Sequence, residues 1–124
     1  MKIRIKDDSV RFRLTKSEVK ALGEEGKIEA LTHFNTAVFG YVVVLDADAS
    51  QLYAEFKYQK IILFLPEKLG KNWFREDRVG FEHFQKINQN RTLHLLLEKD
   101  FTCLDNTLED QSDNYPNPKL QPNP

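Results

Sequence analysis

The sequence predicts an α+β domain built mainly of antiparallel β-hairpins, with about eight strands, two short helices and an extended carboxy-terminal tail. Apolar and polar residues alternate at period two along most of the chain, which is typical of half-buried strands. Turn-forming residues separate these runs at short intervals, so neighbouring strands should pair as hairpins. A length of 124 residues suits one domain with its own core.

The first hairpin is the most basic part of the chain. Residues 2–6 alternate basic side chains with isoleucine, and residues 10–14 alternate apolar side chains with arginine. The intervening Asp7-Asp8-Ser9 has the composition of a turn. The alternation predicts an apolar core face and an opposite face that carries five cations: Lys2, Arg4, Lys6, Arg11 and Arg13.

A capping box predicts the first helix. In Thr15-Lys16-Ser17-Glu18 the threonine and glutamate are spaced to satisfy each other's backbone amides. We expect a helix over residues 16–23, with Gly23 and Gly26 as its stop.

A second helical segment is expected within residues 67–78. Leu69, Trp73 and Phe74 have near-helical spacing in this polar stretch, which predicts a short helix or helical turn. The two adjacent aromatic residues either anchor a partner or belong to the core, and the core is the favoured interpretation.

Six further strands follow from the alternation. They are expected at residues 28–34, 38–45, 52–57, 60–65, 79–87 and 91–98. Tyr58-Gln59 should form a two-residue turn, although it lacks the Gly or Asn that such turns prefer. We expect Val79, Phe81 and Phe84 to face the core. Consecutive hairpins leave exposed edges unless the sheet curls and closes, so a curved sheet or a small β-barrel is expected.

The composition changes near residue 105. We therefore expect a single domain over residues 1–104 and an acidic, proline-containing tail over residues 105–124, either extended on the surface or disordered. The tail holds four acidic side chains and one lysine, whereas residues 1–20 are mainly basic. The two ends could attract one another or bind separate partners.

Bulk composition indicates a soluble, cytoplasmic protein. Hydrophobic residues make up 40% of the chain, charged residues make up 30%, and the net charge is −1. No signal peptide is apparent, and the longest apolar runs, at residues 41–45 and 61–66, are too short to span a membrane. The lone Cys103 excludes an intramolecular disulfide and favours a reducing compartment.

Familiar catalytic, cofactor and metal patterns are absent from the sequence. His33, His83 and His94 lack metal-ligand spacing, and Asp46-x-Asp48-x-Ser50 lacks the later glycine and glutamate of a calcium loop. A nucleophilic pair of Cys103 with a histidine stays open, although a buried thiol at a strand end is favoured. We therefore expect no catalytic set, metal or cofactor.

The basic hairpin face has two interpretations. Arginine forks suit phosphate or carboxylate, so the five cations form a candidate anion- or ligand-binding site. The favoured alternative is a solvated surface with Glu29, Glu55 or Glu98 as cross-strand partners. Nucleic acid is not expected as a partner, because stacking aromatics should interleave with the cations and Phe12 belongs to the opposite face.

Several motifs resemble those of a small uncharacterised bacterial family, a domain of unknown function. They are MKIRIK at the start, RFRLTKSE from Arg11, VGFE from Val79, LLEKDFTCL from Leu96, then Glu109-Asp110, Asp113 and Tyr115-Pro116-Asn117-Pro118. The resemblance spans most of the chain and implies that the tail is part of the domain. It implies no activity.

A second resemblance concerns architecture alone. A barrel of inward-facing charges is similar to triphosphate-tunnel proteins, whose first strand carries a Glu-x-Glu-x-Lys pattern for metal and phosphate. Here Lys2-x-Arg4-x-Lys6 stands instead, so the metal-binding glutamates are missing and only anion binding would be retained.

Three functional hypotheses follow. The first is a non-catalytic domain whose basic hairpin face binds an anionic small molecule or an acidic protein segment. The second is a phosphate- or polyphosphate-handling enzyme with the same cations inside a barrel, together with Glu29, Glu55 and Glu98. In the third, the basic face receives the acidic tail of the same chain. The sequence predicts no oligomeric state.

Overall fold

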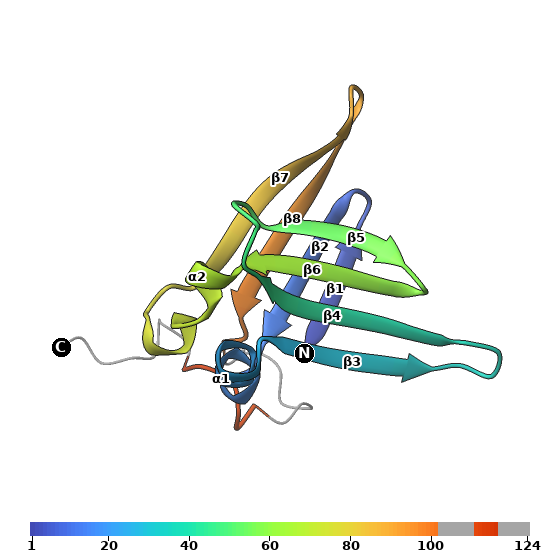
Figure 1. Ribbon diagram of the computed structural model, residues 1–124. Coiled ribbons are helices and arrows are strands. Elements are labelled where there is room, and N and C mark those ends of the chain that lie inside the picture. Colours follow the sequence, from blue (N-terminus) through green and yellow to red (C-terminus); the bar gives the residue numbers. More distant parts are fainter. Residues whose placement is uncertain (102–110, 117–124) are drawn as a thin grey trace.

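The computed structural model describes residues 1–101 and 111–116, and in that part the predicted elements are present (Figure 1). The strands are β1 (Lys2–Lys6), β2 (Ser9–Leu14), β3 (Lys27–His33), β4 (Val38–Asp46), β5 (Tyr53–Lys57), β6 (Lys60–Pro66), β7 (Gly80–Asn88) and β8 (Arg91–Lys99). The helices are α1 (Lys16–Glu25), α2 (Glu67–Gly70) and the 3₁₀ helix η1 (Trp73–Arg75).

Local chemistry explains the boundaries of α1. The Thr15 amide donates to Glu18 Oε1 at 2.9 Å, which confirms the capping box. Gly26 has φ +80° and its amide donates to the Leu22 carbonyl, so the helix ends two residues later than expected, with a left-handed glycine.

The Tyr58-Gln59 turn is confirmed even though it contains no glycine. Its two residues have φ of 53° and 63°, the left-handed values that a two-residue hairpin turn requires. Lys57 and Lys60 are paired on either side of it. The pairing of β5 with β6 therefore holds two non-glycine residues in a conformation they rarely adopt alone.

The eight strands form two four-stranded sheets, which corrects two expectations. The strand order is β1-β2-β8-β7 in sheet A and β3-β4-β6-β5 in sheet B. The hairpins are antiparallel, but they join through parallel inner pairs, β2 with β8 and β4 with β6. The sheets are thus mixed rather than antiparallel throughout, and the described strands form no closed barrel.

The packing of the core explains why neither sheet needs to close into a barrel. The inward side chains of both sheets join one apolar cluster, to which β2 contributes Phe12 and Leu14 and β6 contributes Leu63 and Leu65. In Figure 1 the strands of sheet A cross those of sheet B. Helix α1 follows the end of β2, and helix α2 follows the end of β6. Each sheet therefore buries its apolar face against the other instead of curling onto itself.

Side chains cover part of one open sheet edge. The Ala54 amide on edge strand β5 donates to Gln85 Oε1 at 2.7 Å, and Gln85 Nε2 donates to the Ala54 carbonyl at 3.2 Å. His83 Nδ1 lies 2.7 Å from the Leu52 carbonyl. Side chains of β7 thus satisfy backbone groups of β5 and of Leu52 just before it, which protects this edge without closing a barrel.

Residues 111–116 lie against the start of α1 and the end of β8. Ser17 Oγ donates to Asp113 Oδ2 at 2.5 Å, and the Lys16 amide donates to the Asp113 carbonyl at 3.1 Å. The Tyr115 amide donates to the Asp100 carbonyl at 2.8 Å. Cys103 and the rest of the expected tail lie outside the described residues.

The aromatic pair Trp73 and Phe74 belongs to the core. Trp73 is fully buried and its indole Nε1 donates to the Arg78 carbonyl at 2.8 Å, while Phe74 packs against the core, so the core interpretation of this pair is confirmed. No described helix is long and apolar enough to cross a membrane.

Candidate anion site on the outer face of sheet A

The basic residues of β2 face away from the core. Along β2, Val10, Phe12 and Leu14 are buried, whereas Arg11 and Arg13 alternate with them and are partly exposed. The expected separation of an apolar and a basic face is therefore present. It also corrects the hypothesis of cations inside a barrel, because these arginines lie on the outer face of an open sheet.

Strand register places like charges directly opposite one another. Arg4 on β1 is paired with Arg11 on β2, and Lys2 is paired with Arg13. Lys6 is paired with Ser9, which leaves it without an opposing cation in the pairing. Like charges opposite one another in a sheet destabilise it by roughly 0.2–1 kcal/mol per pair, so this arrangement is unfavourable without a counter-charge.

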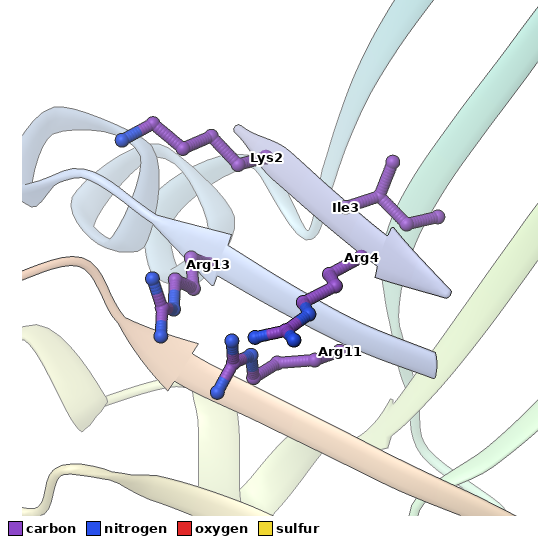
Figure 2. Close-up of a pocket in the computed structure, with 5 residues that line it drawn as sticks. All are labelled: Lys2, Ile3, Arg4, Arg11 and Arg13. Carbon is purple, nitrogen blue, oxygen red and sulfur yellow. The ribbon is translucent and has the colours of Figure 1, made fainter. Parts of the chain in front are cut away.

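Three of the five cations gather into one cluster, Arg4, Arg11 and Arg13, hereafter the arginine cluster. Figure 2 shows their guanidinium groups on the same side of β1 and β2, while Lys2 points away from them. A hollow of about 220 Å³ is lined by Lys2, Ile3 and the arginine cluster. A second hollow of about 120 Å³ is lined by Arg4, Lys6, Ser9, Arg11 and Leu96.

Among the described residues, Glu98 is the carboxylate at ion-pair distance from the cluster. Its Oε1 lies 3.7 Å from Arg11 Nε, a long pair. Within residues 1–101 and 111–116, Arg4 and Arg13 have no carboxylate at ion-pair distance. Burial, and next the neighbouring charge of Arg13, lower the pKa of Arg11, while Glu98 opposes this shift. The cluster therefore carries more positive charge than its nearest protein carboxylate balances.

The other expected carboxylate partners lie elsewhere. Lys60 Nζ lies 2.5 Å from Glu29 Oε2 and Lys57 Nζ lies 3.2 Å from Glu55 Oε2, both within sheet B. The expectation that these two glutamates face the basic hairpin is therefore wrong, because they belong to the other sheet. Glu98 is confirmed as a cross-strand partner.

Lys2 is part of a different contact. Its Nζ lies 2.9 Å from Oδ2 of the buried Asp100, which follows β8. The described tail residue Asp113 likewise contacts α1 rather than the arginine cluster. Residues 102–110, with their acidic side chains, lie outside the described part, so the hypothesis of a tail on the basic face stays a prediction.

Comparison with known families adds one finding. A family model described as a family of unknown function, DUF7009, matches residues 1–119. The chain belongs to this family. The resemblance to an uncharacterised domain is thus confirmed. No curated protein and no solved structure matches the chain.

In this DUF7009 chain, sheet A brings two rings that sequence reasoning missed onto the same outer face as the cations. Phe84 is 60% exposed and stacks on His94, with ring centroids 4.3 Å apart and an interplanar angle of 2°. The expectation that Val79 and Phe84 face the core is wrong. Phe81 is buried, and Phe84 follows it by three residues, so alternation along β7 puts the two rings on opposite faces.

The candidate metal ligands His83, His94 and Asp46 of the DUF7009 chain make contacts within the fold. His94 Nε2 lies 2.6 Å from Glu82 Oε2, while His83 contacts the Leu52 carbonyl on the opposite face of the sheet. Among the residues that the structure describes, no three histidine, cysteine or acidic side chains gather as a metal site. Asp46 accepts hydrogen bonds from the Asp48 amide and the Tyr53 hydroxyl, so the expected turn is confirmed.

Proposed function

We propose that the domain is a non-catalytic binding module that holds a small oxyanion, a phosphate or carboxylate group, on the outer face of β1 and β2. The observation that carries the proposal is the arginine cluster: three guanidinium groups on one side of the hairpin, with one long ion pair, to Glu98, among the residues that the structure describes. Lys6 continues the cationic surface along the second hollow.

Charge balance supports this function. The facing pair Arg4 and Arg11 would repel in the free domain, and a bound oxyanion between them converts that repulsion into two attractions. Guanidinium forks donate two parallel hydrogen bonds to phosphate or carboxylate oxygens. The two hollows share these two arginines, so they form adjoining parts of one site.

Side-chain chemistry supports binding rather than catalysis. Arginine stays protonated across the physiological pH range, so the cluster can orient and neutralise an anion but cannot accept a proton from it. The hollows are small and local, which suits a compact anionic group better than the broad contact of a folded protein partner.

Isothermal titration calorimetry with pyrophosphate tests the proposal. We expect saturable binding to the wild-type domain and a loss of about tenfold or more in affinity for the Arg4→Ala/Arg13→Ala variant, because charge-assisted hydrogen bonds are removed. Lys20→Ala/Lys68→Ala removes two exposed lysines from the helices and is the matched control. Equal affinity of the wild type and the double arginine variant would refute the site.

Two further experiments, a phosphate-release assay and a peptide titration, separate the alternatives. Release of orthophosphate from tripolyphosphate in the presence of Mg²⁺ would contradict the non-catalytic assignment. If a glutamate-rich peptide binds more tightly than pyrophosphate and its binding also depends on the arginine cluster, the ligand is an acidic protein segment rather than a small molecule.

A further inference from the structure

The outer face of sheet A continues beyond the arginine cluster, and its register defines three rows across the four strands. The first row is Lys2, Arg13, Glu98 and Gly80; the second is Arg4, Arg11, Leu96 and Glu82; the third is Lys6, Ser9, His94 and Phe84. His94 is thus in the row next to Arg11 and one strand away from it. Ser9, with its small side chain, lies between Lys6 and the ring of His94.

The stacking geometry orients the ring of His94. Its neighbour Phe84 lies on the adjacent strand β7, and the two ring planes are parallel within 2° at a centroid distance of 4.3 Å. Phe84 covers one face of the imidazole, and the strand register places His94 between Phe84 on β7 and Ser9 on β2. Ser9 has a short side chain, and 29% of the His94 side chain is exposed.

Neighbouring groups hold this ring in place. Glu82 Oε2 lies 2.6 Å from His94 Nε2, and Phe84 supports the ring from the side of β7. The second hollow of the anion site is lined by Ser9, which is paired with His94, and by Leu96, which lies two residues from His94 on β8. The supported ring of His94 therefore lies beside Ser9, one register row from the pair Arg4 and Arg11 that shares the hollow.

We propose that the ligand of this site is a nucleotide-like anion, an oxyanion joined to a planar aromatic ring, and that the ring stacks on His94 above Ser9. This inference rests on the proposed anion-binding function and adds a ligand class to it. A ring above Ser9 lies two residues along β2 from Arg11, about 6.6 Å at the usual rise of a strand, which is about the length of a short linker. Stacking on an aromatic side chain tolerates different rings, because each has a π-face.

The charge pattern limits the ligand to a short one. Glu98 and Glu82 occupy β8 and β7 beside the arginine cluster, so in these two rows the cationic surface ends after β2. A longer polyanion that continued across sheet A would meet these carboxylates. The face therefore suits a single nucleotide-like molecule rather than a nucleic acid strand.

A comparison of AMP with ribose 5-phosphate, by calorimetry on the full chain, tests the inference. The two probes carry the same phosphate, and only AMP carries an aromatic ring. We expect AMP to bind roughly 5- to 150-fold more tightly, which is the usual effect of one stacked base. Equal affinities would overturn the ring site while leaving the anion site intact, whereas failure of both probes to bind would refute the proposed function itself.

Variants assign the ring to His94. His94→Ala should remove the advantage of AMP and leave ribose 5-phosphate binding unchanged, while His94→Phe should restore it. His33→Ala, at the exposed end of β3, is the matched control. An unchanged advantage in His94→Ala would refute the placement, and tighter binding of a short oligothymidylate than of AMP would overturn the small-ligand class.

Discussion

Arg4 and Arg11 face each other across the antiparallel pairing of β1 and β2, on the side of sheet A that is turned away from the core. In the hairpin alone this pair is unfavourable. With an oxyanion between the guanidinium groups it becomes a binding element, so stability and function should oppose one another at this position.

Replacing Arg4 should therefore stabilise the free domain. We expect Arg4→Gln to raise the free energy of unfolding by roughly 0.2–1 kcal/mol in low salt, because it removes a facing like charge. The gain should shrink as salt screens the repulsion. Urea unfolding measures the change, and Lys6→Gln is the control, since Lys6 faces Ser9. A loss of stability in Arg4→Gln would contradict repulsion between Arg4 and Arg11 in the free domain.

The amide of Gln85 should contribute to stability through the edge of sheet B. Gln85→Leu removes both of its hydrogen bonds to Ala54 and leaves two backbone groups of β5 without this partner. We expect a loss of about 1–3 kcal/mol in the free energy of unfolding. Lys86→Leu, one residue further along β7 and exposed, should change stability little in the same urea experiment. Equal effects of the two substitutions would argue against edge protection.

Acid should release residues 111–116 from α1. Hydrogen bonds, first that from Ser17, lower the pKa of Asp113. Because the folded-state pKa is below the unfolded value, the stability from this carboxylate is present above the unfolded pKa and is lost as pH falls through the folded one. NMR shifts of the Tyr115 amide should report this release, and Asp113→Asn should show the released shifts already at neutral pH. Identical spectra of the variant and wild type at neutral pH would contradict this anchor.

Tyr53 should ionise late. Burial, followed by its 2.8 Å hydrogen bond to Asp46, raises the pKa of its phenol to about 12. Its raised pKa means that the associated stability is complete below the ordinary tyrosine pKa and is lost as pH rises toward the folded value. Tyrosinate absorbance of the wild type minus that of Tyr53→Phe isolates this group. Asp46→Asn should lower its midpoint, and an unshifted midpoint in that variant would contradict the role of the hydrogen bond.

Much of the fold follows from local chemistry. Alternation located the strands because each sheet has one buried face, and the capping box located α1 because Thr15 and Glu18 satisfy each other's backbone amides. The parallel pairing of β2 with β8 could not be predicted in this way. It joins segments far apart in the sequence, and the choice among open hairpin edges depends on how the two sheets bury one another.

The cationic residues of the candidate site could be predicted from the sequence. Their position on the outer face of sheet A could not. Alternation placed Arg11 and Arg13 on one face, but only the packing of Phe12 and Leu14 into a core between two sheets decides that this face is the outer one. His94 and Phe84 join the same face through pairings that no local pattern specifies. The sheet topology, rather than a local sequence pattern, therefore places these two rings near the cations.

The most direct test of the anion site is an NMR titration of the isotopically labelled domain with pyrophosphate. We expect saturable shifts of the Arg4, Arg11 and Arg13 signals on β1 and β2, with sheet B residues such as Lys57 and Lys60 unaffected. Shifts centred on sheet B, or none at millimolar pyrophosphate, would contradict it.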